Sequence, residues 1–438
     1  MALGGGTWQT QDKALPGTYI NFISASQTDA SQSLRGVVAV PLMLSWGSGG
    51  VLRLQAEDFE KSCLKLFACE YTTAEIMPLR ELFRNAKTVL LYRMVSADAA
   101  KAANTYAEAR YAGTKGNTLK TIIAKNADDP DKFDVTTYVG DHLADTQIVA
   151  SAADLTDNDF VCFKTDASLA VTGAATAALT GGTDGTTVTG EQYKAFLTAM
   201  ESYTFNILCC PSADADIIAL FAAFTHRMVR ESGANFQLVC YKPTAADSEY
   251  VIGVGTAVND TPAYGLVYWV SGAEAACEAN ASVTNKTYDG ELPVDVSASR
   301  AELSAALKAG KFMLHSVNGE VRVLKDINTL VTTGTGKSDD FKSNQIMRLC
   351  CDAANRIAQL FNTQYLGKIQ NDADGRISLW NDVCKIFQNY EKERAITNFS
   401  TDNVTVEAGE TKDAVVCRIG AIYAAHAMDA LYMNIVIA

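Results

Sequence analysis

The C-terminal residues 403–438 constrain the fold most, because they hold three β-type segments with little chain between them. These segments are residues 403–407, 414–420 and 431–438, and the sequence stops within the third. Such a strand either pairs within its own sheet or is donated to the sheet of another subunit. A similar run, residues 15–23, follows the glycines Gly4-Gly5-Gly6. Two strand-like ends predict a protein that links to copies of itself.

Bulk properties exclude several classes of protein. With 37 basic and 50 acidic residues the net charge is 37 − 50 = −13, which argues against nucleic acid as a direct ligand. No apolar run approaches the roughly 18 residues that span a bilayer, and the N-terminus has no signal-peptide pattern, so we expect neither membrane insertion nor export. The 11 cysteines include the adjacent pairs Cys209-Cys210 and Cys350-Cys351 in apolar segments. These features favour buried, reduced thiols in a cytosolic protein.

Periodicity and composition predict a multidomain chain of the α/β and α+β classes. A helix is expected at 74–84, between strands at 36–40 and 88–95. The predicted units are an N-terminal arm (1–29), a small α/β segment (30–95), an inserted all-β domain (96–182), a central α/β domain (183–335) and a C-terminal domain (336–438) whose terminal arm is 429–438.

The inserted domain is predicted from short apolar runs that are separated by Asn, Asp and Gly turns. The expected strands are 118–123, 133–138, 147–149 and 160–163. The domain closes in an Ala-, Thr- and Gly-rich tract, residues 174–185, which is typical of a solvated loop.

The central domain is predicted to contain a βαβ unit with a parallel sheet. Near-continuous apolar strands are expected at 203–210 and 236–241, with a helix between them that starts at Ser212 and ends at Gly233. Asn318-Gly319 between two apolar runs predicts a type I′ hairpin. Further helices are expected at 264–279, 302–309, 339–362 and 377–394.

Motifs for chemistry are weak. Residues 333–338 resemble the end of a phosphate-binding loop, but Val331 stands where that loop needs glycine, so an inter-domain linker is favoured. Gly253-Val-Gly255 lacks the third glycine of a dinucleotide fingerprint. The four histidines have no metal-ligand spacing, and neither Cys-x-x-Cys nor Gly-x-Ser-x-Gly occurs. We therefore expect no enzyme activity, cofactor or metal.

Several segments, in order along the chain, resemble contractile tail sheath proteins of phages and prophage-like elements of Gram-positive bacteria. They include Met1-Ala-Leu-Gly-Gly-Gly, Leu15-Pro-Gly-Thr-Tyr-Ile-Asn-Phe, Arg35-Gly-Val-Val-Ala-Val-Pro-Leu, Ala112-Gly-Thr-Lys-Gly-Asn-Thr-Leu, Leu179-Thr-Gly-Gly-Thr-Asp-Gly, Asp326-Ile-Asn-Thr-Leu, Tyr365-Leu-Gly-Lys-Ile-Gln-Asn and Asp429-Ala-Leu-Tyr-Met. A local departure is Ala425-His-Ala-Met-Asp, where a proline-containing approach to the last strand is expected.

The resemblance implies a structural subunit of a virion tail or phage-tail-like particle, assembled in the host cytoplasm. Such subunits stack as six-fold rings around an inner tube, contract, and also contact baseplate and terminator proteins. Their N-terminal arm and last strand enter the sheets of neighbouring subunits. Here the linking residues would be Thr18, Tyr19, Ile20, Asn21, Phe22, Tyr432, Asn434, Ile435, Val436 and Ile437, with Val404, Val406, Val415 and Cys417 as the receiving hairpin.

Two further expectations concern movement and the tube. Gly4–Gly6 and the segment 420–428 are predicted to be hinges. Lys342, Arg348 and Arg356 share one predicted helix of the domain expected to face inward, so they are candidate contacts to acidic groups on the tube; the alternative is an ordinary solvated face. Two other functions stay open: a cytosolic α/β nucleotide-binding enzyme that uses Gly334–Ser338, and an inner-tube or capsid protein, which would usually be one compact β-rich domain.

Overall fold

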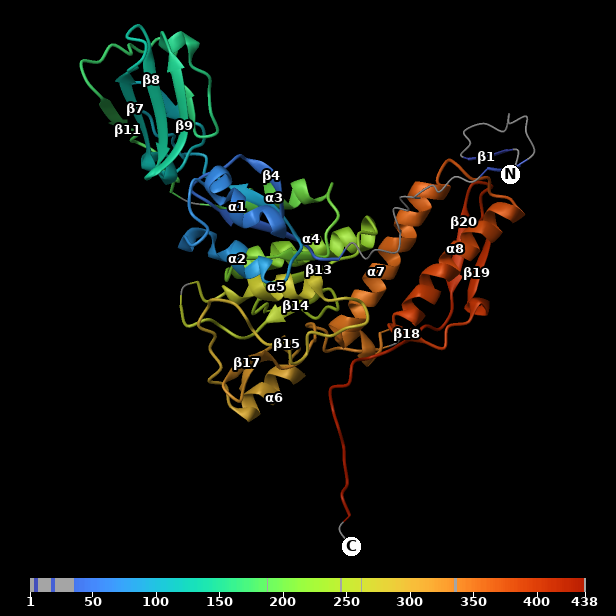
Figure 1. The fold of residues 1–438 in the computed structure, drawn as a ribbon. Coiled ribbons are helices and arrows are strands. Elements are labelled where there is room, and N and C mark those ends of the chain that lie inside the picture. Colours follow the sequence, from blue (N-terminus) through green and yellow to red (C-terminus); the bar gives the residue numbers. More distant parts are fainter. Residues whose placement is uncertain are drawn as a thin grey trace.

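A seven-stranded sheet forms the centre of the structure, a computed structural model that describes residues 4–6, 17–19, 35–186, 188–244, 246–260, 262–334 and 337–436 (Figure 1). The strand order is β15-β14-β13-β12-β3-β5-β4, and only the β4–β5 pair is antiparallel. The strands are β3 (Val37–Met43), β4 (Gly50–Gln55), β5 (Thr88–Met94), β12 (Ile207–Cys209), β13 (Gln237–Tyr241), β14 (Val251–Val254) and β15 (Lys311–Phe312). The sheet joins strands from the predicted segments 30–95 and 183–335. The prediction that these segments are separate units is therefore wrong, because they share one sheet.

Helices cover both faces of this sheet, which explains why its strands are apolar on both sides. One face packs against α1 (Ala56–Phe67), α2 (Met77–Phe83) and α5 (Leu266–Ala276), and the other against α3 (Gly190–Met200) and α4 (Ala215–Glu231). Alternate residues of β3 serve the two cores, with Val38 and Val40 on the first face and Ala39 on the second. The predicted helix after β12 is confirmed, but Asp214 rather than Ser212 caps it by accepting from the backbone N–H of Asp216.

A β-sandwich is inserted between β5 and β12. Its strands are β6 (Ala107–Ala109), β7 (Leu119–Lys125), β8 (Phe133–Val139), β9 (His142–Val149), β10 (Val161–Phe163) and β11 (Ala175–Ala178), in the sheets β11-β7-β8-β9 and β10-β6. The loop prediction for 174–185 is wrong in part, because β11 pairs with β7 along the sheet edge. Two segments of the chain, one entering the sandwich near Asp98 and one leaving it near Thr186, form its neck. They are hydrogen-bonded to each other: the backbone N–H of Ala100 donates to Thr183, and Thr186 donates to Asp98.

The predicted hairpin is confirmed as β16 (Leu314–Val317) and β17 (Glu320–Val323). Asn318 and Gly319 have φ values of 53° and 89°, as the type I′ turn requires. In the sequence, this hairpin comes after the short helix α6 (Arg300–Lys308) and strand β15. The short 3-10 helices are η1 (Ala74–Ile76), η2 (Thr114–Thr118), η3 (Ala152–Asp154), η4 (Asp339–Lys342) and η6 (Thr401–Asn403).

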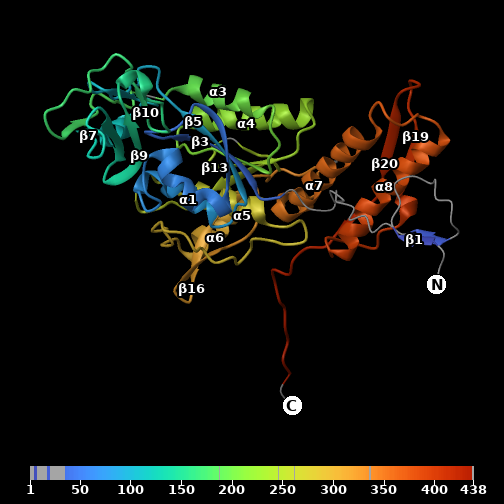
Figure 2. The same ribbon diagram turned by 45° about the horizontal axis from the view of Figure 1, so that its top comes forward.

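Two long helices begin the C-terminal part, as predicted. They are α7 (Asn344–Leu360), which continues into the π-turn η5 (Phe361–Tyr365), and α8 (Ala373–Lys392). The strands that follow are β18 (Ile396–Thr397), β19 (Val404–Ala408), β20 (Val415–Ile419) and β21 (Tyr423–Ala424), which pair as β19-β20 and β18-β21. Beyond them the chain projects away from the body as an extended tail in both views (Figures 1 and 2). Among the described helices, none has the length and hydropathy to cross a bilayer.

Candidate subunit-linking site

The extended tail carries large apolar side chains in full exposure. Residues 425–436 form neither helix nor strand. Tyr432 is 96% exposed and Val436 is 90% exposed, and Ile435 and Asn434 are exposed as well. Of the predicted linking residues here, only Ile437 lies outside the described residues. An extended apolar segment with an unpaired backbone is suited to joining the edge of another sheet, and residues 425–436 do not pair within their own sheet, which was the first alternative.

The β19–β20 hairpin offers such edges. Val404 lies opposite Ile419, Val406 opposite Cys417, and Ala408 opposite Val415. The structure therefore brings the four predicted receiving residues onto one face, where they pack on the core that includes α8, and Trp380 Nε1 donates to the carbonyl of Val404. Their side chains anchor the hairpin to its own subunit. In the part of the chain that is described, no further strand pairs with either β19 or β20. Because Trp380 already occupies the carbonyl of Val404 on the β19 side, the outer edge of β20 is the more open of the two.

The N-terminal candidate is described only in part. β1 (Gly4–Gly6) pairs in parallel with β2 (Gly17–Tyr19), which contains Thr18 and Tyr19. The other candidates, Ile20, Asn21 and Phe22, lie outside the described residues. Because Gly4–Gly6 is paired with β2, these glycines form a strand rather than the predicted hinge.

The prediction that Arg348 contacts the tube is wrong, because its side chain is 1% exposed. Arg348 ion-pairs with Glu274 on α5 and with Asp326, whose Oδ2 lies 2.7 Å from its Nη2. Arg356 is largely buried, pairs with Asp352 at 2.9 Å and lies over the Tyr390 ring. Only Lys342, which pairs with Asp339 in η4, is substantially exposed. Two of the three predicted cations, Arg348 and Arg356, therefore form ion pairs inside the subunit rather than a cationic surface.

Arg348, Glu274 and Asp326 form a buried charge cluster that connects α5, α7 and the loop after β17. Burial raises the pKa of Glu274 well above its usual value, and the neighbouring carboxylate of Asp326 raises it further. For Asp326, burial works to raise the pKa, but the charge of Arg348 together with hydrogen bonds from Glu274, Arg348 and Asn344 lowers it overall. Burial and the cation of Arg348 thus shift the pKa values of these two neighbouring carboxyl groups in opposite directions. A lone acid in the otherwise apolar α5 was the available signal for this buried cluster, which the sequence reasoning missed.

The described part of the degenerate loop lacks the features of a nucleotide site. Gly334 and Lys337 form an isolated bridge, and Lys337 Nζ lies 2.7 Å from Glu249, while Thr335 and Gly336 are outside the described residues. The next α-helix begins only at Asn344, whereas a phosphate-binding loop opens directly into a helix. All 11 cysteines are free, and the described residues contain no cluster of metal-ligating side chains.

Comparison with known proteins covers almost the whole chain. Three family profiles match: the phage tail sheath protein beta-sandwich domain at residues 96–184, the central domain at 186–329 and the C-terminal domain at 336–438. The phage-like element PBSX protein XkdK of Bacillus subtilis is 30% identical over 99% of both chains.

Solved structures agree. The sheath tail protein of Desulfitobacterium hafniense is 32% identical, with a TM-score of 0.77 over 90% of this chain and 93% of that one. The helical sheath of the anti-feeding prophage in its contracted state shares the fold, with a TM-score of 0.53 at 13% identity over 97% and 99% of the two chains. The chain belongs to the phage tail sheath protein family.

Proposed function

We propose that this protein is the repeating subunit of a contractile tail sheath. Subunits would polymerise as stacked hexameric rings around an inner tube and contract to drive the tube through a bacterial envelope. The observation that carries the proposal is the exposed, unpaired apolar arm at residues 430–436, together with a hairpin in the same chain that pairs with no other described strand. One copy therefore holds both halves of a strand-addition joint.

The strength of one joint follows from its hydrogen bonds. Each backbone hydrogen bond contributes a net stabilisation of about 0.5–1.5 kcal/mol, so a strand as long as β19 adds a few kcal/mol, besides the burial of its apolar side chains. One joint of this kind is modest. Repeated in every subunit, such joints would hold the rings together while the globular parts move.

The movement needs no bound nucleotide in this proposal. The free energy would come from better packing between neighbouring subunits in the contracted state, as for any interface with two stable arrangements. The α7–β20 region would lie next to the tube and the sandwich on the outside. The partners would be other copies of this chain, the tube protein, and baseplate and terminator proteins, in a virion tail or tail-like particle assembled in the bacterial cytoplasm.

Electron microscopy of the purified chain tests the proposal. We expect negative-stain images to show hollow tubes with six-fold symmetry, because each subunit carries its own linker and receiver. In parallel, binding of ATP at millimolar concentration is measured for the wild type and for Lys337→Ala. Monodisperse particles at all protein concentrations, together with nucleotide binding that Lys337→Ala abolishes, would instead support the nucleotide-binding enzyme.

A further inference from the structure

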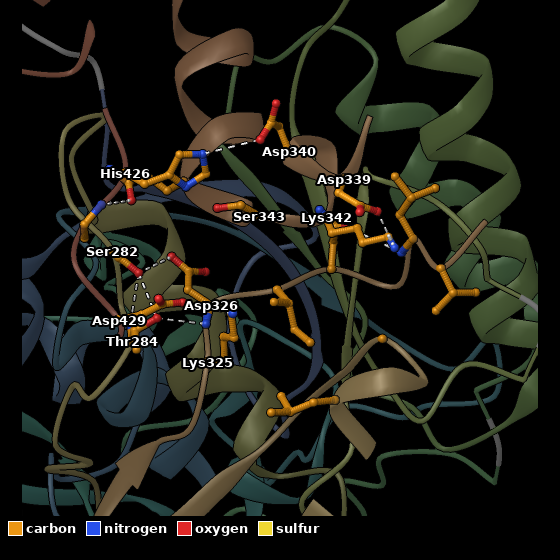
Figure 3. Close-up of a pocket in the computed structure, with 18 of the residues that line it drawn as sticks. Ser282, Thr284, Lys325, Asp326, Asp339, Asp340, Lys342, Ser343, His426 and Asp429 are labelled. Atoms are coloured by element: carbon orange, nitrogen blue, oxygen red, sulfur yellow. Dashed lines mark hydrogen bonds and ion pairs between the residues drawn. The ribbon is translucent and has the colours of Figure 1, made fainter. Parts of the chain in front are cut away.

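The root of the C-terminal arm, residues 425–429, runs beside a cavity of about 580 Å³ (Figure 3). His426 and Asp429 approach it from the arm, and Lys325, Asp340 and Ser343 from the body. Although predicted to be part of a hinge, this segment is held to the body at several points. The arm therefore has a fixed beginning, and the position of that beginning decides how the free part leaves the subunit.

Gln345, in the first turn of α7, holds the middle of the root. Its side-chain Nε2 donates to the carbonyl of Ala425 at 3.0 Å, and its Oε1 accepts from the backbone N–H of Ala427 at 3.0 Å. One amide bonded to the C=O of a residue and to the N–H two positions later repeats the pattern that a neighbouring parallel strand makes. The Gln345 side chain is 3% exposed, so losing its partners would leave a buried amide unpaired, which is costly; the bonds themselves are part-buried, because Ala427 is exposed.

Contacts on either side extend the attachment. Upstream, β21 pairs with β18, and the backbone N–H of Ala425 donates to the carbonyl of Ala395 at 2.9 Å. Downstream, Asp429 forms an ion pair with Lys325 at 2.9 Å, and the pKa of Asp429 is lowered by that hydrogen bond and charge. Past Asp429, no described residue makes a hydrogen bond or ion pair with the body. The predicted hinge at 420–428 is therefore wrong, because the body holds this segment, and Ala430 is the first described residue of the arm beyond these contacts.

We propose that Gln345 is a positioning residue that clamps the arm root, so that the arm pivots at Ala430 and leaves in one direction toward a second copy of this chain. This inference rests on the proposed sheath function. From Ala430 the remaining residues, 430–438, reach at most about 30 Å when fully extended. The receiving edge of the neighbour must lie within that distance of Ala430. Releasing the root would lengthen the free segment to 425–438 and remove its direction.

The test compares two variants of the full-length chain. Gln345→Met keeps the side-chain volume but removes both hydrogen bonds to the root. The matched control is Asn355→Ala, also on α7, whose side chain donates to the carbonyl of Asn235 at 2.8 Å rather than to the arm. Hydrogen–deuterium exchange of peptides covering residues 425–429 reports the clamp in unassembled subunits. The protein concentration at which tubes first form, from light scattering and electron microscopy, reports positioning.

With Gln345→Met, exchange at Ala427 is expected to accelerate at least tenfold, and the concentration needed for tubes to rise about two- to tenfold, since a longer free segment lowers the effective concentration of the strand. Asn355→Ala should change neither. If Gln345→Met does not fold, Gln345→Glu keeps the acceptor for Ala427 and loses the donor to Ala425, and it should show a smaller change of the same kind.

The outcomes separate the clamp from the sheath function. Wild-type protein that never forms tubes would contradict the proposed function, while faster exchange in Gln345→Met would still support the clamp. Wild-type tubes combined with unchanged exchange at 425–429 would overturn the clamp. Faster exchange with an unchanged concentration for tube formation would overturn the positioning role.

Discussion

Removal of residues 431–438 is expected to leave a folded subunit that does not form tubes. The described residues of this segment belong to none of the four hydrophobic cores and are exposed, so their loss should change the free energy of unfolding by no more than about 0.5 kcal/mol. The same truncation removes every backbone hydrogen bond that the arm would make to a neighbour. Thermal melting should match the wild type, while negative-stain images should lack tubes. Deletion of residues 1–22 is expected to act in the same way on the second link.

A point substitution sharpens this test. Ile435→Lys keeps the backbone of the arm but places a charge where an apolar contact is expected, and it should weaken assembly strongly. The matched control is Leu143→Lys on β9 of the sandwich, where an equally apolar side chain is 60% exposed and far from the arm. Normal tubes from the truncated chain would show that the last strand is not the link.

Replacing Arg348 by Met is expected to destabilise the subunit by about 3–5 kcal/mol, because it leaves buried carboxyl groups without their cation. Both partners are shielded: the side chains of Glu274 and Asp326 are 0% and 2% exposed. Since α7 carries Arg348 and α5 carries Glu274, the loss should first loosen the C-terminal helices from the central sheet. Urea unfolding followed by tryptophan fluorescence and circular dichroism measures the change.

The controls separate buried charge from lost packing. Lys385→Met removes an exposed ion pair with Asp382 and should cost no more than about 1 kcal/mol. The triple variant Arg348→Met, Glu274→Leu and Asp326→Asn removes the whole charge set and should regain much of the lost stability. If Arg348→Met alone lowers the free energy of unfolding by less than about 1 kcal/mol, the buried charge cluster does not hold the C-terminal helices to the central sheet.

Much of the fold could be predicted because its signals are local. The hairpin at Asn318-Gly319, the helix α4 and the buried strands β3 and β5 each follow from spacing within a few residues. Helix α1 was missed because Gln55 ends β4 and also begins the helix, without a glycine, proline or side-chain cap at the boundary. Helix α3 was missed although Thr189 and Gln192 form a readable capping box.

The site divides in the same way. The apolar character of the terminal segment could be read from its local composition, but its described residues, 425–436, are extended without forming a strand. The burial of Arg348 could not be predicted, since it depends on Glu274 and Asp326, which lie far away in the chain. The held arm root was mispredicted as a hinge for a similar reason: its small residues look unconstrained until Gln345 folds against them.

The hydrogen-bonded neck of the β-sandwich has a consequence for engineering and for evolution. Its incoming and outgoing chains are already joined at Ala100–Thr183 and Asp98–Thr186, on the central side of the module. Whatever lies beyond this clasp could be exchanged without cutting any strand of the central sheet, if the replacement also covers Trp46, which packs on Tyr111 and Phe160 of the sandwich. The neck is therefore the natural place to graft a foreign domain, and to look for variation in length among related particles.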